Sequence, residues 1–359
     1  MSAAPEELLL DGPFALDRVA KSQRLVQRLL ELTRHHHAAC EPYGRIIDRL
    51  HAGWPETATR EDLPYLPVGV FKHLLLASVP PEEIVRELRS SGTSGTASRI
   101  VLDRITAGLQ TRALAKIVAD FIGIERRPML VVDQSDLLRG AASLNARGAA
   151  VLGFSNFGRQ QTYALAPDLS LDIGTVHQFA ERFRETPVLL FGFTFIVWQY
   201  LVLASQREGR KFEFAPGSVL IHGGGWKRML DIRVDNTAFK AGIAETLGIH
   251  QVHNYYGMAE QVGTIFMECA HGRLHTTDYS DVVVRDPLSL APQPDGAAGL
   301  LQVLSELPHS YPGHSLLTED VGAITGEDDC PCGRKGRTLR VDGRLPRTEL
   351  RGCSDTRVL

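Results

Sequence analysis

The chain has 359 residues, 43% of them hydrophobic, and a formal net charge of -3, so it can bury a large core as one large domain or two subdomains. This composition argues against a disordered chain and against nucleic acid as a partner. Five cysteines, an odd number, argue against a disulfide framework, and the first residues lack the basic start and apolar run of a secretory signal. We therefore expect a cytoplasmic protein.

The first predicted region, residues 1–83, combines a helix with an extended arm. Apolar residues at helical spacing predict an amphipathic helix over 17–38. The three histidines near its end, residues 35–37, are interpreted as a solvated helix end rather than as a metal site. Prolines exclude a regular helix over 63–72, which is expected to pack as an extended arm.

Residues 84–263 are expected to form an α/β core with a largely parallel sheet, because short apolar runs alternate with helical patterns. The apolar runs are at 84–88, 129–132, 149–154, 188–191 and 219–221, and a helix is predicted over 106–123. The uncharged segment 187–206 has the length of a membrane span. Its proline, glycine and polar residues favour instead a buried strand, a turn and a buried helix, which could also line a pocket for an apolar ligand.

Beyond this core, the pattern shifts to short strands and turns, for example at 281–285 and 299–304. Residues 264–345 are therefore predicted to form a small β-rich subdomain packed on the sheet. Residues 346–359 are predicted to be a C-terminal tail.

A loop rich in glycine and hydroxyl side chains occupies residues 90–96. Glycines let backbone N–H groups turn toward anionic oxygens, and the hydroxyls add further donors. The motif therefore predicts a loop that binds the phosphates of ATP. It is not a Walker P-loop, since no Gly-Lys-Ser/Thr follows at the required spacing. A flexible surface loop is the alternative. The residues are Ser90, Ser91, Gly92, Thr93, Ser94, Gly95 and Thr96.

Four further motifs follow this loop in chain order. Three glycines at the end of a predicted strand would let the backbone approach a flat ligand closely. A tyrosine and a carboxylate then lie four residues apart across a glycine, a Thr-Glu-Asp sequence offers a carboxylate to ribose hydroxyls, and an arginine follows a glycine turn. Each motif alone is weak, but their order in one chain is far more specific. The residues are Gly223, Gly224 and Gly225; Tyr256, Gly257 and Glu260; Asp320; and Arg344.

This order of motifs resembles the adenylate-forming superfamily of acyl-CoA synthetases and adenylation domains, over about residues 84–353. Within that superfamily the chain is most similar to the acyl-protein synthetases (LuxE-like) of the bioluminescence-type fatty-acid reductase complex, through residues 256–261 and the terminal Arg-Gly-Cys at 351–353. The resemblance implies an adenylate-forming N-terminal core, with parallel-rich sheets flanked by helices, and ATP and Mg²⁺ as cofactors.

The resemblance also implies roles for individual residues. The loop at 90–96 would hold the ATP phosphates, Tyr256 would stack near adenine, and Asp320 and Arg344 would hold the ribose. Glu260 would bind Mg²⁺ through its carboxylate. The implied reaction is attack of a carboxylate on the α-phosphate of ATP, which gives acyl-AMP and pyrophosphate.

The chain departs from the superfamily pattern in three places. The lysine that usually follows the glycine loop is missing, with Arg99 the nearest cation, and Ala259 stands where many relatives have threonine or serine. The sequence ends at Leu359, where ordinary members continue into a mobile C-terminal domain. That domain would carry a mobile lysine used in adenylation and help to form the pantetheine tunnel, so its expected absence argues against ordinary CoA ligation.

Cys353 offers another acyl acceptor, because the resemblance places it on a loop that swings into the active site. Arginines at 347, 351 and 357 would favour its thiolate, which could attack acyl-AMP and leave an acyl-enzyme thioester. An acyl reductase or acyltransferase would be the partner that receives the acyl group. From position alone, an inert cysteine in a frayed tail is the alternative.

The other predicted metal is a structural zinc ion. Cys330 and Cys332 place two thiolates on one turn, and Cys269 with His275, or with His271, would complete a tetrahedral site. Related phenylacetate-CoA-ligase-like proteins carry a similar set, and free thiols are the alternative.

The sequence thus predicts an ATP-dependent acyl-protein synthetase. The uncharged stretch 188–202 favours a hydrophobic acid such as a fatty acid as the substrate. An acyl-CoA or carrier-protein ligase is the first alternative, and a catalytically weak regulatory partner of an acyl reductase is the second.

Overall fold

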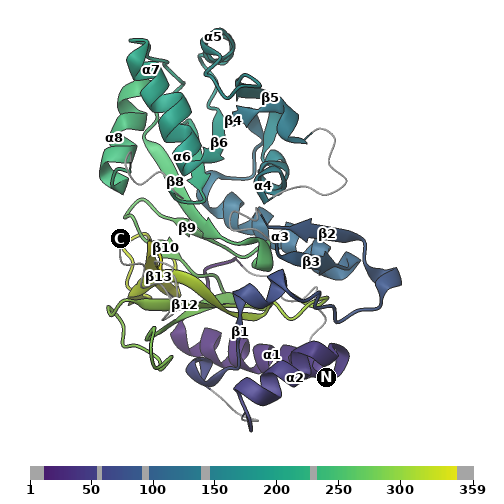
Figure 1. The fold of residues 1–359 in the computed structure, drawn as a ribbon. Helices are drawn as coiled ribbons and strands as arrows, with labels where there is room; N and C mark the ends of the chain where they lie inside the picture. Colours follow the sequence, from purple (N-terminus) through teal and green to yellow (C-terminus); the bar gives the residue numbers. More distant parts are fainter. Residues whose placement is uncertain (1–11, 55–58, 91–96, 139–145, 227–232, 346–359) are drawn as a thin grey trace, which may run out of the picture.

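The computed structural model describes residues 12–54, 59–90, 97–138, 146–226 and 233–345 (Figure 1). A twelve-stranded sheet dominates the fold, and eleven of its strands follow the order β11-β12-β13-β14-β10-β9-β8-β7-β6-β4-β5, with β1 paired to β13. The α/β class predicted from the sequence is confirmed.

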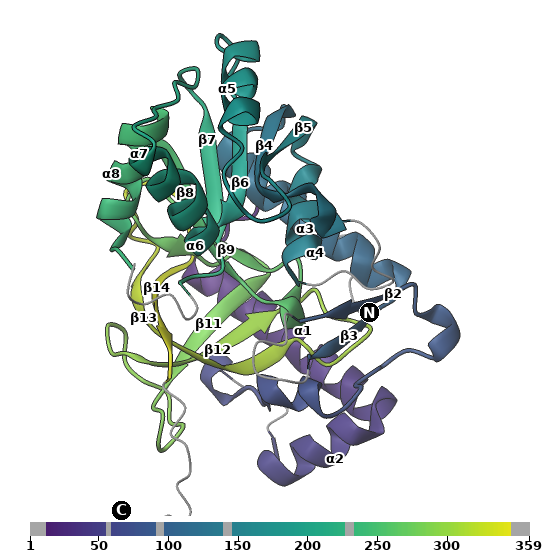
Figure 2. The same cartoon turned by 45° about the horizontal axis from the view of Figure 1, so that its top comes forward.

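Five parallel strands form one half of this sheet, and helices cover both of its faces. Alternate residues of the strands point to opposite faces: Met129 and Val131 pack with α3 and α4, whereas Leu130 and Val132 pack with α5 and α8. Figure 2 shows α7 and α8 on one side of the strands and α3 and α4 on the other. The strands are β4 (Arg127–Gln134), β5 (Gly158–Leu165), β6 (Leu189–Phe193), β7 (Val219–Gly223) and β8 (Gln251–Gly257); the helices are α3 (Arg104–Ile122), α4 (Ala146–Ser155), α5 (Ile173–Arg182), α6 (Thr194–Ile196), α7 (Leu203–Arg207) and α8 (Asn236–Leu247).

The segment after β8 is rich in antiparallel strands. The sheet continues into it through the antiparallel pairing of β8 with β9, so these strands extend the sheet edge to edge rather than only packing on it. They are β9 (Ile265–Glu268), β10 (Leu274–His275), β11 (Ser280–Arg285), β12 (Gly299–Ser305), β13 (Ser315–Glu327) and β14 (Arg337–Arg344). The domain boundaries after residues 83, 263 and 345 stay predictions.

The N-terminal region packs against these antiparallel strands. Asp17 caps α1 by accepting a hydrogen bond from the backbone N–H of Ala20, and Leu25 and Leu29 of α1 pack with Val283 and Leu304. The expected extended arm is in part correct, since its strand β1 pairs with β13 before the chain turns into a 3₁₀ helix. The elements are α1 (Arg18–Ala39), α2 (Glu41–Leu50), the 3₁₀ helix Arg60–Asp62, β1 (Leu66–Pro67), and the 3₁₀ helices Val68–Lys72 and Pro81–Glu83.

Two local predictions were wrong. The apolar run 149–154 lies in helix α4 and not in a strand, because its residues are rich in alanine and extend a helical segment from Ala146. The prediction of a solvated helix end was wrong for His36, which is fully buried and hydrogen-bonds the Ser78 hydroxyl and the carbonyl of Pro308; His35 is exposed and His37 is partly exposed, as expected.

The uncharged segment 187–206 forms β6, α6, a π-helical turn at Val197–Val202 and α7, in agreement with the predicted strand, turn and helix. None of the helices in the described residues has the length and apolar character needed to span a bilayer.

Candidate functional site

The hydroxyl- and glycine-rich motif joins two strands of a small hairpin, β2 (Arg86–Arg89) and β3 (Arg99–Leu102). At its base, the Ser98 backbone N–H donates to Ser90 Oγ at 2.9 Å, and the Ser90 N–H donates to the carbonyl of Ser98 at 3.1 Å. Ser90 thus closes the loop from one side. Residues 91–96, which are Ser91, Gly92, Thr93, Ser94, Gly95 and Thr96, lie outside the described residues.

Arg99, the first cation after this loop in the sequence, pairs with Glu87 on the neighbouring strand. Its Nε and Nη2 donate to the two carboxylate oxygens at 3.1 and 3.0 Å. The hydrogen bonds from Arg99 lower the pKa of Glu87. In this conformation the Arg99 guanidinium is held on the surface of the hairpin.

Three predicted nucleotide-binding residues from distant parts of the chain meet directly. Tyr256 Oη donates to Asp320 Oδ2 at 2.7 Å, and Arg344 Nε donates to Asp320 Oδ1 at 3.0 Å. Burial, followed by the charge of Asp320, raises the pKa of Tyr256 well above its ordinary value, so the hydroxyl stays a donor. The Tyr256 ring stacks on the Phe266 ring, with 6.1 Å between the two ring centroids. One carboxylate in β13 thus orients a phenol from β8 and a guanidinium from β14, all three strands lying in the interior of the sheet.

The glycine turn follows β7. A Cβ on Gly223 would lie 2.6 Å from the Tyr255 ring, and one on Gly224 would lie 2.5 Å from the Phe193 ring. Gly224 and Gly225 have φ values of 79° and 62°, which L side chains rarely adopt. This turn therefore requires glycine for space and for conformation.

Sequence reasoning missed two residues that fix this turn. Thr194 Oγ1 lies 3.0 Å from the carbonyl oxygen of Gly223, to which it donates, and 3.0 Å from His222 Nδ1. The hydroxyl has one proton, so His222 Nδ1–H is the donor to Thr194. Burial lowers the pKa of His222 to about 3 and keeps it neutral. The only sequence signal was the position of His222 directly before the glycines.

Glu260 lies in the 3₁₀ turn Ala259–Gln261, which joins β8 to β9. The residue is 8% exposed, and its backbone carbonyl accepts a hydrogen bond from Tyr311 Oη at 2.9 Å. A Cβ added to Gly257, at the end of β8, would lie 3.0 Å from the side chain of Ile265. Tyr256 and Glu260 thus flank one tight strand junction.

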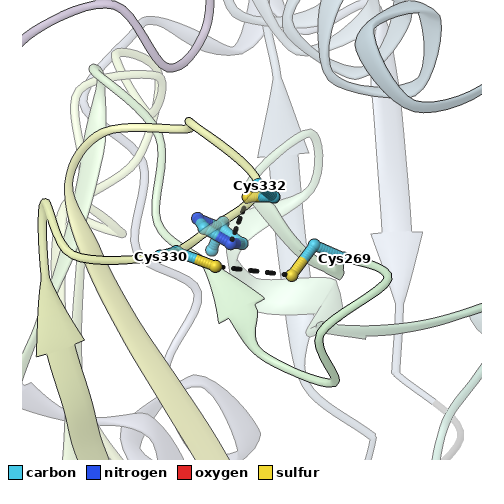
Figure 3. A group of neighbouring side chains, drawn as sticks. Cys269, Cys330 and Cys332 are labelled. Carbon is cyan, nitrogen blue, oxygen red and sulfur yellow. Dashed lines mark hydrogen bonds between the residues drawn. The ribbon is translucent and has the colours of Figure 1, made fainter.

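A second cluster contains Cys269, His275, Cys330 and Cys332, whose ligand atoms all lie within 4.8 Å of one another. Figure 3 shows the sulfur atoms of Cys269 and Cys330 facing each other. They are 3.7 Å apart, and Cys332 Sγ is 3.4 Å from His275 Nε2. A tetrahedral zinc ion with Zn–S bonds of about 2.3 Å would separate two sulfurs by about 3.8 Å.

The surroundings of this cluster also fit a metal. Burial, followed by the positive charge of Arg334, lowers the pKa of His275 to about 4, so the imidazole is neutral and able to coordinate a cation. Its Nδ1 is buried without a hydrogen-bond partner among the described residues. His275 joins the cluster and His271 does not. Three sulfurs and one nitrogen are a donor set typical of structural zinc.

Cys353 and the arginines at 347, 351 and 357 lie outside the described residues. The structure therefore assigns no position to the predicted acyl acceptor.

Comparison with solved structures identifies the fold. The chain resembles an open conformation of 2-hydroxyisobutyryl-CoA ligase in complex with 2-HIB-AMP and CoA, with a TM-score of 0.68 and 19% identity, over 94% of this chain and 78% of that one. The same ligase in its thioesterification state, also with 2-HIB-AMP and CoA, gives a TM-score of 0.68. The fold is that of adenylate-forming ligases.

Comparison with characterised sequences identifies the family. The long-chain-fatty-acid–luciferin-component ligase of Vibrio harveyi is 24% identical over 97% of this chain and 91% of that protein. The protein of the same description from Aliivibrio fischeri is 26% identical over 86% of this chain and 79% of that protein. The family model described as acyl-protein synthetase, LuxE, matches residues 2–358. The chain therefore belongs to the LuxE family of acyl-protein synthetases, which are ligases.

Proposed function

We propose that this chain activates a long-chain fatty acid with ATP and then transfers the acyl group to its own Cys353. In the first step, a carboxylate oxygen attacks the α-phosphorus of ATP, the bond between the α- and β-phosphates breaks, and pyrophosphate leaves. In the second step, the Cys353 thiolate attacks the acyl carbonyl, a thioester forms, and AMP leaves with the electron pair of the broken C–O bond.

The contact of Tyr256 and Arg344 with the single carboxylate of Asp320 carries this proposal. Such an arrangement presents an aromatic ring beside a carboxylate, the pair of groups suited to adenine and to ribose hydroxyls. The glycine turn at 223–225 begins beside Tyr255 on the neighbouring strand, and a Cβ on Gly225 would meet no described atom within 4 Å, so a flat ligand could approach the backbone at this position. Ser90 begins the loop for the phosphates. Positioning of this kind can supply much of the rate enhancement in a phosphoryl-type transfer.

Glu260 is proposed to hold the Mg²⁺ that accompanies ATP. Its carboxylate oxygens are the hard ligands that this ion prefers. Bound Mg²⁺ would neutralise negative charge that builds up on the phosphates. The chain contributes the position of Glu260, one short turn after Tyr256.

The Cys269, His275, Cys330 and Cys332 cluster is proposed to be a structural zinc site. It joins the turn after β9, the strand β10 and the turn between β13 and β14. Zinc there would hold these segments together and would take no part in the reaction. As in the family that the sequence resembles, we expect an acyl reductase to receive the acyl group.

Mass spectrometry of the protein after incubation with ATP, Mg²⁺ and a panel of carboxylic acids tests the proposal. We expect release of pyrophosphate, together with a mass increase at Cys353 that matches a long-chain acyl group. Acylation of added CoA alone would favour the CoA-ligase alternative, and absence of pyrophosphate with every acid would favour a regulatory partner.

A further inference from the structure

Residues 306–314, here called the crossover segment, connect β12 to β13 without regular secondary structure. Irregular segments usually lie on the surface, because their backbone groups need water or other partners. In this segment, however, Ser310 and Tyr311 are fully buried and His314 is 1% exposed. The partners of their polar groups therefore show what the segment holds in place.

The crossover segment contacts the turn that contains Glu260. Tyr311 Oη donates to the carbonyl oxygen of Glu260 at 2.9 Å, and Gln261 Nε2 donates to the carbonyl of Gly313 at 2.7 Å. A Cβ on Gly313 would lie 2.2 Å from the Tyr311 ring and 2.9 Å from the Glu260 carbonyl oxygen. The segment and the turn are therefore packed so closely that only glycine fits between them.

The same segment contacts the hairpin of the phosphate loop. Ser310 Oγ donates to the carbonyl of Val101 in β3 at 2.8 Å, and the Ser310 N–H donates to Thr106 Oγ1 in the first turn of α3 at 3.0 Å. Tyr311 itself belongs to a hydrophobic cluster with Leu88 and Ile100 of the hairpin. The crossover segment thus bridges the hairpin and the Glu260 turn.

We propose that Tyr311 is a positioning residue for adenylation, whose hydroxyl fixes the Glu260 turn relative to the β2–β3 hairpin so that Glu260 can meet the metal of the bound nucleotide. This inference rests on the role of Glu260 in the proposed function. Burial raises the pKa of Tyr311, so its hydroxyl keeps the proton that it donates. Loss of that hydroxyl would leave the buried Glu260 carbonyl without this partner.

A matched control separates positioning from simple stabilisation. Tyr279 is also buried, at 2% exposure, and its hydroxyl also donates to a backbone carbonyl, that of Ala113 at 3.2 Å. This contact lies in the cluster between α3 and the parallel strands rather than at the Glu260 turn. Tyr311→Phe and Tyr279→Phe therefore each remove one buried hydroxyl donor, and only the first touches the proposed metal ligand.

Binding of Mn²⁺, followed by electron paramagnetic resonance in the presence of α,β-methylene-ATP, tests the proposal without requiring turnover. We expect the Mn²⁺ dissociation constant of Tyr311→Phe to rise about 10-fold, which corresponds to about 1.4 kcal/mol, and that of Tyr279→Phe to stay within about 2-fold of the wild-type value. Both variants are expected to unfold at a lower temperature. Equal dissociation constants in the two tyrosine variants would overturn the proposal.

Two further variants keep the result interpretable. If Glu260→Gln weakens Mn²⁺ binding but Tyr311→Phe does not, only the positioning role fails. If Glu260→Gln binds Mn²⁺ as the wild type does, the metal role of Glu260 fails and the positioning role fails with it. Should Tyr311→Phe not fold, Ser310→Ala tests the hairpin contact of the same segment, and unchanged Mn²⁺ binding in that variant would also overturn the proposal.

Discussion

Tyr256 Oη and Asp320 Oδ2 lie 2.7 Å apart, although the two residues are separated by 64 positions in the chain. The other oxygen of the same carboxylate accepts from Arg344, so the end of β8, the middle of β13 and the end of β14 meet at one side chain. A carboxylate that orients two other groups is costly to remove, because each partner then loses a charge-assisted hydrogen bond.

We therefore expect Asp320→Asn to weaken ATP binding by at least about 10-fold, equivalent to about 1.4 kcal/mol, because the variant loses charge beside both the proposed nucleotide site and Arg344. Isothermal titration with α,β-methylene-ATP measures this effect. Asp342→Asn is the matched control, since Asp342 also accepts from an arginine, Arg340, at 3.0 Å, but on the exposed end of β14. Equal losses in the two variants would argue against a specific role for Asp320.

Glu260→Gln keeps the size of the side chain but removes the charge proposed to hold Mg²⁺. Exchange of labelled pyrophosphate into ATP, with the fatty acid present, should fall by more than about 10-fold, or about 1.4 kcal/mol of activation barrier. The exposed Glu245, which pairs with Lys211 on the surface, serves as a control, and Glu245→Gln should exchange at the wild-type rate. Wild-type exchange in Glu260→Gln would remove Glu260 from the metal role.

The sequence predicted groupings that the structure brings together, Tyr256 with Asp320 and Arg344 and the three cysteines with His275, because such residues occur in short motifs with a fixed order; their binding roles stay predictions. Tyr311 and Thr194 could not be predicted in this way. Each donates a hydrogen bond to a backbone carbonyl of a residue far away in the sequence, and a tyrosine or threonine alone in a sequence does not reveal such a partner.

Strand β5 and the burial of His36 also could not be predicted from the sequence, for physical reasons. Strand β5 was missed because its first residues, Gly158 to Gln161, are polar or lack a side chain and lie at the edge of the sheet. The burial of His36 depends on Ser78 and Pro308, which are remote in sequence. Helical periodicity correctly predicted α1 but carried no information on which polar residues of the helix would find buried partners.

The cysteine cluster predicts a stoichiometric zinc ion in carefully purified protein. Elemental analysis should find one zinc per chain in the wild type and much less in Cys332→Ser, which removes one of the four ligands. Structural zinc can contribute on the order of 10 kcal/mol in small domains, so Cys332→Ser and chelation should both lower the unfolding temperature. Cys40→Ser changes a buried thiol outside the cluster and should keep the metal. A metal-free wild type would rule out the zinc site.

The buried carboxyl group of Glu306 should make the stability of the protein depend on pH in a specific way. Burial raises its pKa from 4.5 to about 7, and both carboxylate oxygens are buried without hydrogen bonds among the described residues. Because folding raises the pKa of this carboxyl group, its protonated form favours the folded state. The favourable contribution of Glu306 to the free energy of unfolding is therefore complete below about pH 4.5 and is lost as the pH rises through about 7. Each pKa unit corresponds to about 1.4 kcal/mol, so the change amounts to a few kcal/mol.

Chemical unfolding of the wild type and Glu306→Gln between pH 5 and 8 measures this contribution. Glutamine has no charge to bury. The free energy of unfolding of the variant, minus that of the wild type, should therefore increase as the pH rises. Buried histidines such as His314, whose pKa burial lowers to about 3, contribute the opposite slope below pH 6.5 in both proteins. The difference between the two curves therefore isolates Glu306, and a difference that does not change with pH would contradict the prediction.

Cys353→Ser separates the two proposed half-reactions. Formation of acyl-AMP, followed as pyrophosphate exchange, should continue in this variant because the thiol takes no part in the first step. The hydroxylamine-labile thioester should disappear, since a serine hydroxyl is a far weaker nucleophile than a thiolate near neutral pH. Cys40→Ser should retain both activities. If labelled acyl groups remain thioester-linked to Cys353→Ser, or if they pass only to free CoA, self-acylation at Cys353 is excluded and the CoA-ligase function takes its place.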